Sequence, residues 1–384
     1  MDSIKTLPRA AQIYLSVSAL LVAVYIERQF GADKIFWDLA VYQGAAEAVA
    51  RGEDPYANPV NGLRFVYAPA FADLLSVFST QIILIFLSAY AICVAGFVVA
   101  APPLLAWSLI GVFGLFAFQP QHLGISVATG NVTIFVHLIV ILLWVKQHHR
   151  ALLVTIVLAS LVKPSFAAYF GLWFCAGAPM LGRAMVYAAL GLLSVIAAWW
   201  AQAVLDPVRF DAFLGSLSAQ VWSGSGLPDN GFGTLFWGNL VGLSQTSSLL
   251  AHVALWAVVA ISFRAIVKKT APDQRFKVAV LAGAAIICCY GNMRLKTYDL
   301  AAMGILVAWL GLELCRRTHS GRWVWAFAGL MLLISVVATD ILDAGPVLRR
   351  SRWAIEALTL ILLPFLFVKA SVRTAGASRV VSRT

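Results

Sequence analysis

The chain has 384 residues, of which 61% are hydrophobic and only 12% are charged. A soluble domain carries about 25% charged residues, so this composition excludes an ordinary soluble protein, and the continuous apolar runs predict a polytopic helical membrane protein and not a β-barrel. The formal net charge of +11 does not indicate a nucleic-acid partner, because the basic residues lie in alternate loops and not along one face.

The apolar runs and the charges between them predict a topology. Lys5 and Arg9 precede the first apolar run, and Glu27 follows it without a small-residue cleavage pattern, so we interpret this run as an uncleaved signal anchor. The candidate spans, about twelve crossings, are 10–27, 81–100, 103–118, 131–145, 151–163, 165–179, 184–204, 249–267, 276–290, 298–314, 323–341 and 353–369.

The distribution of charge orients these spans. If the N-terminus is inside, the inner loops hold most of the Lys and Arg residues. They hold only three acidic residues, which are Asp2, Asp273 and Glu313. This is the distribution that the positive-inside rule expects. The sequence therefore predicts one all-α membrane-embedded domain over 1–369 and a basic cytoplasmic tail at 370–384. Both termini are then cytoplasmic, and the first loop, 28–66, faces outward.

The most informative segment is a polar stretch over 36–69 that separates apolar runs. Small and apolar residues recur at helical spacing over 36–51, and Gly52 follows as a natural stop, so we predict a helix that lies on the outer membrane surface. The apolar segment 69–78 is too short to cross. It either lies at the interface or dips into the membrane and returns.

Two ionisable residues each have a functional and a structural interpretation. Asp38, at the start of the surface helix, can act as a general base toward a hydroxyl, or it can cap the helix N-terminus. Lys163 precedes Pro164 at the outer end of two short predicted helices, where it can meet a phosphate. Alternatively, this lysine snorkels and marks a helix end.

A dense polar cluster precedes the predicted span 298–314. It contains Arg294, Lys296, Tyr298 and Asp299. Two cations beside a carboxylate can bind an anion while the local charge stays tolerable. An ordinary outer loop is the alternative, but two basic residues in a very short outer loop run against the positive-inside rule, which favours a function.

Two other outward segments give weaker signals. His122 can hydrogen-bond a phosphate or a hydroxyl, although a lone histidine is usually structural. Gly130 and Asn131 open a helix and would expose free backbone N–H groups. Trp222 and Trp237 either anchor the chain at the membrane interface or stack on a sugar.

Several common catalytic motifs are absent from the sequence. It has no Walker motif, no zincin His–Glu pair and no GxSxG elbow. The six histidines are scattered, so no metal ligand set is predicted. The five cysteines lie in or beside apolar runs, and we interpret them as small apolar fillers without a disulfide framework. We therefore expect neither a metal nor a cofactor.

The order and spacing of these motifs resemble glycosyltransferase family 87, which includes polyprenol-phosphate-mannose-dependent α-mannosyltransferases of bacterial envelopes. The similarity spans nearly the whole chain, and one family position differs, because the Gln of the family's Gly-Gln-x-Asn motif is missing. The strings that carry it are Asp38-Leu-Ala-Val-Tyr42, Gly52-Glu-Asp-Pro-Tyr56, Tyr67-Ala-Pro69, Thr129-Gly-Asn131, Lys163-Pro164 and Arg294-Leu-Lys-Thr-Tyr-Asp299.

This resemblance implies a GT-C fold in the bacterial cytoplasmic membrane with an outward-facing active site. The implied donor is a polyprenyl-phosphate sugar, with mannose the expected hexose, and the acceptor is a hydroxyl of a lipid or glycan. Asp38 is implied as the base, and inversion of configuration is a family expectation. Expected contacts to the donor phosphate are Arg294, Lys296, Lys163 and His122. Expected contacts to the sugar or acceptor are Tyr42, Tyr67, Asn131, Tyr298 and Asp299.

Two other classes of protein stay open. A transporter or lipid flippase also has broken helices and buried charges, but it usually shows internal symmetry and polar residues near the mid-membrane. No repeat is evident here, and the predicted polar residues lie at the outer rim. A non-catalytic subunit of an envelope assembly is the second alternative, because the departure at Gly130 and Asn131 leaves room for a member that has lost activity.

Overall fold

The computed structural model describes residues 8–9, 12–13, 37–60, 62–108, 130–176, 181–222, 233–269, 274–292, 295–318, 354–355 and 357–369. The named elements are α3 (Trp37–Ala50), α4 (Pro69–Ser76), α5 (Ile82–Ala100), α8 (Thr133–Val145), α9 (His149–Val162), the 3-10 helix η1 (Pro164–Gly171), α10 (Leu172–Cys175), α11 (Leu181–Leu205), α12 (Pro207–Trp222), α13 (Thr234–Leu240), α14 (Gln245–Lys268), α15 (Gln274–Tyr290) and α16 (Thr297–Thr318). Ala357–Lys369 is a further apolar helix. The predicted all-α class is confirmed for these residues, which contain no strand beyond one isolated β-bridge between Val60 and Leu63.

Three helices in the described part are long and apolar enough to cross a membrane. They are α5, residues Met185–Leu205 of α11, and α14. Large apolar side chains project from them into the surroundings, and Val99 and Leu193 are 86% and 61% exposed. Such continuous exposed apolar surface suits contact with lipid and not with water.

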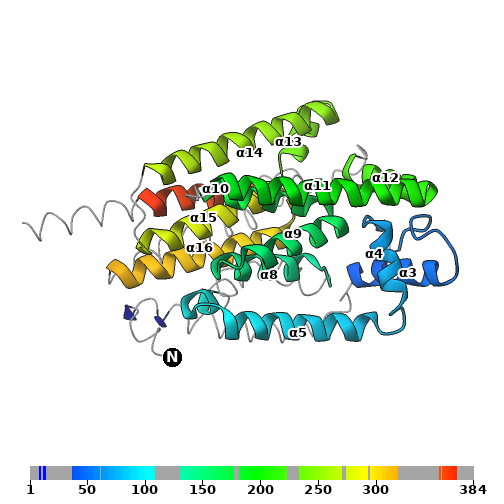
Figure 1. The fold of residues 1–384 in the computed structure, drawn as a ribbon, viewed down its shortest axis with the longest axis horizontal. Coiled ribbons are helices and arrows are strands. Elements are labelled where there is room, and N and C mark those ends of the chain that lie inside the picture. Colours follow the sequence, from blue (N-terminus) through cyan, green and yellow to red (C-terminus); the bar gives the residue numbers. More distant parts are fainter. Residues whose placement is uncertain are drawn as a thin grey trace, which may run out of the picture.

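α8, α15 and α16 form the inside of the bundle, and most of their described side chains are buried. α15 and α16 pack against each other, against α8 and, for α15, against η1 and α14. In Figure 1 they lie between α5 on one side and α11 and α14 on the other. At 1.5 Å per residue the 13 residues of α8 span about 20 Å, less than the roughly 30 Å hydrocarbon core. Its two ends therefore lie closer together than those of the long outer helices.

The predicted span 165–179 is not one regular α-helix over its described residues, 165–176. Lys163 has extended backbone angles, and Pro164 begins η1, an eight-residue 3-10 helix, after which α10 lasts only four residues. The cause is the proline, which disfavours helical angles in the residue before it and cannot donate a backbone hydrogen bond. The broken segment packs into the core through Phe166 and Trp173, which are both buried.

The helix predicted over 36–51 is confirmed as α3, and Gly52 ends it. Gly52 has φ +75°, its N–H donates to the Val49 carbonyl, and the N–H of Glu53 donates to the Ala48 carbonyl. These two bonds around a left-handed residue are the Schellman arrangement. Residues 51–68 then return to the bundle end and lead into α4.

The segment 69–78 contains the short helix α4, which begins with Pro69 at its first position. An eight-residue helix cannot cross a bilayer, in agreement with the prediction from its length. α4 packs against α3 and α12, and Asp73 accepts a 2.8 Å hydrogen bond from Arg209 of α12. In Figure 1, α3, α4 and α12 together cover one end of the bundle.

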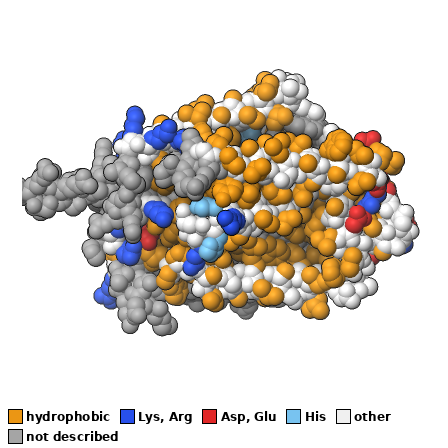
Figure 2. Space-filling model, in the orientation of Figure 1, with side chains coloured by type: hydrophobic (Ala, Val, Ile, Leu, Met, Phe, Trp, Pro, Cys, Tyr) orange, Lys and Arg blue, Asp and Glu red, His pale blue; other side chains and the backbone are white. Residues whose placement is uncertain are grey.

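The two ends of the bundle differ in charge. Lys146 ends α8, Lys268 lies in the last turn of α14, and Arg316 and Arg317 lie in the last turn of α16. Figure 2 shows most visible Lys and Arg side chains toward this end and most acidic side chains at the opposite one, beside α3, α4 and α12. The apolar surface lies between them, as expected for a protein embedded in a membrane.

Candidate functional site

Asp38 is tied to the bundle by a residue 93 positions away. The amide nitrogen of Asn131 donates to Asp38 Oδ2 over 2.8 Å, and Asn131 is buried. Asp38 lies inside the first turn of α3, where the helix dipole favours a carboxylate. The alternative that it only caps this helix does not account for the bond to Asn131.

Asn131 also organises the start of α8. Gly130, with φ +68°, turns the chain, and the Asn131 side-chain oxygen accepts a 2.9 Å hydrogen bond from the backbone N–H of Thr133. The sequence suggested free N–H groups at this helix start, but the one of Thr133 is occupied by this side chain. Asn131 therefore connects Asp38 with the end of α8.

Lys163 also lies at the start of α8, beside Thr133. Its ammonium donates to Thr133 Oγ1 over 3.4 Å and lies 5.8 Å from the centroid of the Phe166 ring. The extended backbone that Pro164 imposes brings it to the corner between α9 and η1. The backbone N–H of Ala68 donates to the neighbouring Val162 carbonyl over 3.4 Å, so the end of the first polar segment docks on this corner.

The tyrosines of the first polar segment form a buried group behind Asp38. The hydroxyls of Tyr42 and Tyr67 are 2.8 Å apart, their rings pack edge to face, and Tyr56 donates to the Tyr67 carbonyl over 2.7 Å. Burial, then the neighbouring Tyr67 and Asp38, holds the pKa of Tyr42 well above its ordinary value, although a backbone hydrogen bond from Val132 opposes this. Tyr42 is therefore a neutral hydroxyl at neutral pH.

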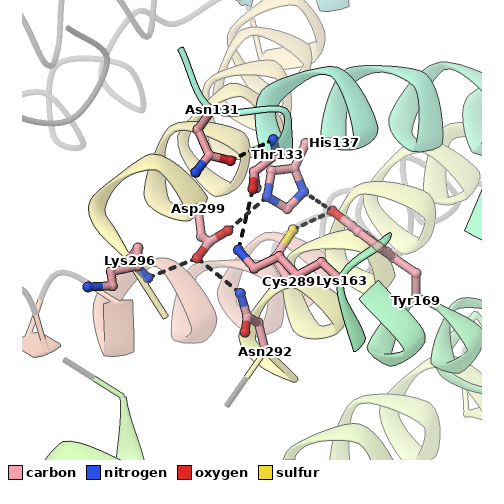
Figure 3. Close-up of polar contacts among 9 residues, drawn as sticks. All are labelled: Asn131, Thr133, His137, Lys163, Tyr169, Cys289, Asn292, Lys296 and Asp299. Carbon is pink, nitrogen blue, oxygen red and sulfur yellow. Dashed lines mark hydrogen bonds and ion pairs between the residues drawn. The ribbon is translucent and has the colours of Figure 1, made fainter. Parts of the chain in front are cut away.

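Asp299, at the start of α16, is fully buried and accepts three hydrogen bonds. Its Oδ1 accepts from His137 Nε2 over 3.0 Å. Its Oδ2 accepts from the Asn292 side chain over 3.1 Å and from the backbone N–H of Lys296 over 2.8 Å. Figure 3 shows this cluster next to Lys163 and Thr133, with the Lys296 ammonium directed away from Asp299.

The sequence reasoning missed His137, Tyr169 and Asn292. His137 Nδ1 lies 2.5 Å from the Tyr169 hydroxyl, which is 2.9 Å from Cys289 Sγ. One signal was available, because an ionisable residue inside an apolar helix such as α8 is a functional-site hypothesis by default. No pattern in the sequence pairs His137 with Asp299, since the two lie 162 positions apart.

Three predicted site residues lie beyond what can be described here. His122 and Arg294 fall outside the described residues. The backbone of Tyr298 belongs to α16, but its side chain is outside the described part. The structure thus brings together Asp38, Asn131 and Lys163 as one group and places Tyr42 and Tyr67 behind it. Lys296 and Asp299 belong to the adjoining polar cluster around α16.

Among the described residues, no group of three or more His, Cys, Asp or Glu side chains is arranged to hold a metal ion. All five cysteines are free thiols, and Cys175, Cys288, Cys289 and Cys315 are buried. The buried thiols agree with their interpretation as apolar fillers, except that Cys289 also contacts Tyr169.

No protein-family model, curated protein or solved structure matches this chain. The resemblance to glycosyltransferase family 87 therefore rests on the sequence motifs alone. The GT-C fold, the number of spans and the activity that it implies stay predictions. The structure adds the spatial relation between the motifs in its described residues.

Proposed function

We propose that this chain is a GT-C-type membrane glycosyltransferase of about twelve spans, similar to family 87. It moves a hexose, with mannose the expected sugar, from a polyprenyl-phosphate donor to a hydroxyl of a lipid or glycan acceptor. The observation that carries this proposal is the junction of Asp38, Asn131 and Lys163. Through Asn131 and Thr133 it links a carboxylate from the first polar segment with a cation from the Lys163–Pro164 corner.

The reaction needs these two kinds of group. Asp38 takes the proton of the acceptor hydroxyl, and the acceptor oxygen forms a bond to the anomeric carbon. The bond from that carbon to the phosphate oxygen breaks, and the lipid phosphate leaves with the electron pair. Cations stabilise the charge that develops on the phosphate, a role that we give to Lys163 and Lys296 and, from the resemblance, to Arg294 and His122.

Other residues shape the site. Asn131 holds Asp38 in place and, by the resemblance, also faces the sugar or acceptor. Tyr42 and Tyr67 form the wall behind Asp38 and support its position through packing. Tyr298 keeps the sugar-binding role that the resemblance implies.

The charge of the bundle ends supports an outward-facing site. Asp38, Asn131 and Lys163 lie where α8 begins and α9 ends, the opposite end from Lys146 and Arg316. Since positive loops stay in the cytoplasm, the site faces the periplasmic side of the bacterial cytoplasmic membrane, and both termini are cytoplasmic. A lipid-linked donor is available on that side, and its apolar tail can remain in the bilayer.

One observation favours a second candidate, a lipid transporter. The buried pair of His137 and Asp299 is the kind of intramembrane ionisable pair that transporters use. Movement of a fluorescent lipid across vesicles containing the purified protein, unaffected by Asp38→Ala, would favour the transporter over the transferase.

The test of the transferase uses purified protein, radiolabelled polyprenyl-phosphate mannose and a bacterial lipid extract as the acceptor source. Wild type is compared with Asp38→Ala and with Glu53→Ala, which changes an exposed carboxylate of the same polar segment. We expect Asp38→Ala to lose at least about 100-fold in rate and Glu53→Ala to stay near wild type. No transfer by wild type, or equal transfer by Asp38→Ala, would refute the proposal.

A further inference from the structure

The connection between α15 and α16 is held by hydrogen bonds from two sides. Its described residues are Gly291, Asn292, Leu295 and Lys296. On one side His252 Nε2 lies 3.2 Å from the Gly291 carbonyl. On the other side, Asp299 binds the Asn292 side chain and the Lys296 backbone N–H. His252 belongs to α14 and Asp299 to α16, and their three contacts hold Gly291, Asn292 and Lys296.

Asp299 both caps its own helix and binds a residue of another helix. Lys296 precedes the first residue of α16, and Asp299 is the third residue of that helix, so its bond to the Lys296 N–H is half of a capping box. The second carboxylate oxygen binds His137 of α8, which is 3.0 Å away. The cap is thereby anchored to a different helix.

The partners of His137 determine which of its two ring nitrogens donates a hydrogen bond and which accepts one. A carboxylate only accepts, so Nε2–H of His137 donates to Asp299, and in the neutral form of the imidazole Nδ1 accepts from the Tyr169 hydroxyl. The Tyr169 oxygen in turn accepts from the Cys289 thiol. In this assignment each donor points toward the carboxylate, and all four side chains are buried.

We infer that His137 is a positioning residue that, through Asp299, holds Asn292 and the Lys296 backbone in the described part of the α15–α16 connection. Its side chain is only 3% exposed and packs edge to face against Phe166 and Tyr169, so it is not placed to touch substrate. The effect on catalysis rests on the proposed function, which gives Lys296 to the donor phosphate. The effect on the connection itself does not.

Hydrogen exchange of the Lys296 amide tests this inference directly. Full-length protein in lipid nanodiscs is compared as wild type, His137→Phe, His137→Gln and His148→Gln, which changes an exposed histidine at the basic end of the bundle. Because a hydrogen bond to a charged group is lost, we expect about tenfold faster exchange in His137→Phe. His137→Gln, whose amide can still donate to Asp299, should stay within about threefold of wild type. The control should match wild type.

Wild-type exchange in His137→Phe would overturn the inference. If that variant does not fold, Tyr169→Phe removes only the hydroxyl that orients the imidazole, and it should accelerate the same amide by about threefold. No change there would also overturn it. With the labelled donor, His137→Phe should raise KM more than it lowers kcat. If wild type transfers no sugar while the exchange result holds, the proposed function fails and the positioning role stands.

Discussion

Asn131 joins Asp38 to the first turn of α8, because its amide nitrogen donates to the carboxylate and its amide oxygen accepts from Thr133. The amide nitrogen and the amide oxygen of this one side chain thus connect α3 with the bundle. A general base has to be held within hydrogen-bond reach of its proton. Asn131 therefore has a positioning role that its predicted sugar contact did not include.

Changing Asn131 should lower activity without removing the base. We expect Asn131→Ala to reduce kcat by about 10- to 100-fold, since Asp38 loses its amide donor. Asn131→Asp should reduce it further, because a second carboxylate repels the first. The measurement is the rate of transfer with saturating donor, with Asn58→Ala on the exposed part of the same outer segment as the control. Full activity in both Asn131 variants would contradict the assignment.

Lys163 should act on the donor. Lys163→Gln keeps most of the side chain but removes its charge, and we expect the KM for the lipid-phosphate sugar to rise at least about tenfold. Lys163→Arg should restore part of the affinity. Lys268→Gln, at the basic end, provides the matched control. An unchanged KM in Lys163→Gln would show that this lysine only marks the end of α9.

The buried Tyr42 predicts a loss of stability at alkaline pH. Its pKa is raised in the folded protein, so the stabilisation is present below the unfolded value of about 10 and is lost as the pH rises above it. Tyr42→Phe should unfold more easily than wild type at pH 8, by about 1 kcal/mol. The gap between their thermal midpoints should narrow at pH 10.5. As the control, Tyr187→Phe should keep the same difference in thermal midpoint from wild type at both pH values. A difference that stays constant for Tyr42→Phe would contradict the prediction.

Gly52 and Gly215 should respond oppositely to alanine. Gly52 has φ +75°, where a Cβ costs about 1–2 kcal/mol, so Gly52→Ala should lower the stability. Gly215 lies within α12, and no atom lies within 4 Å of a Cβ added there, so Gly215→Ala should raise stability by roughly 0.5–1 kcal/mol. Thermal unfolding in the same detergent checks both. Equal shifts of the two variants would contradict the Schellman end of α3.

The sequence predicted local structure well where one residue determines the backbone. Gly52 ended α3, and the length of 69–78 excluded a crossing helix. The irregular start of 165–176 has a physical cause, because hydropathy alone does not distinguish a regular α-helix from a segment that begins as a 3-10 helix. Pro164 predicts the break before this segment but not the helix type after it.

The site was predicted residue by residue but not as a set of contacts. Asp38, Asn131 and Lys163 were each identified from sequence, while the bonds among them depend on how α3, α8 and α9 pack. By spacing alone His137 is one of six scattered histidines, and only its place in the apolar helix α8 sets it apart. Its pairing with Asp299 is a property of the packed bundle.

The most direct test of the central claim is to separate donor binding from transfer in Asp38→Asn. This variant keeps the size of the side chain and removes its basicity. We predict that the Kd for polyprenyl-phosphate mannose stays within about threefold of wild type, while single-turnover transfer falls at least about 100-fold. Transfer at the wild-type rate, or a loss that comes entirely from weaker donor binding, would contradict the role of Asp38 as the base.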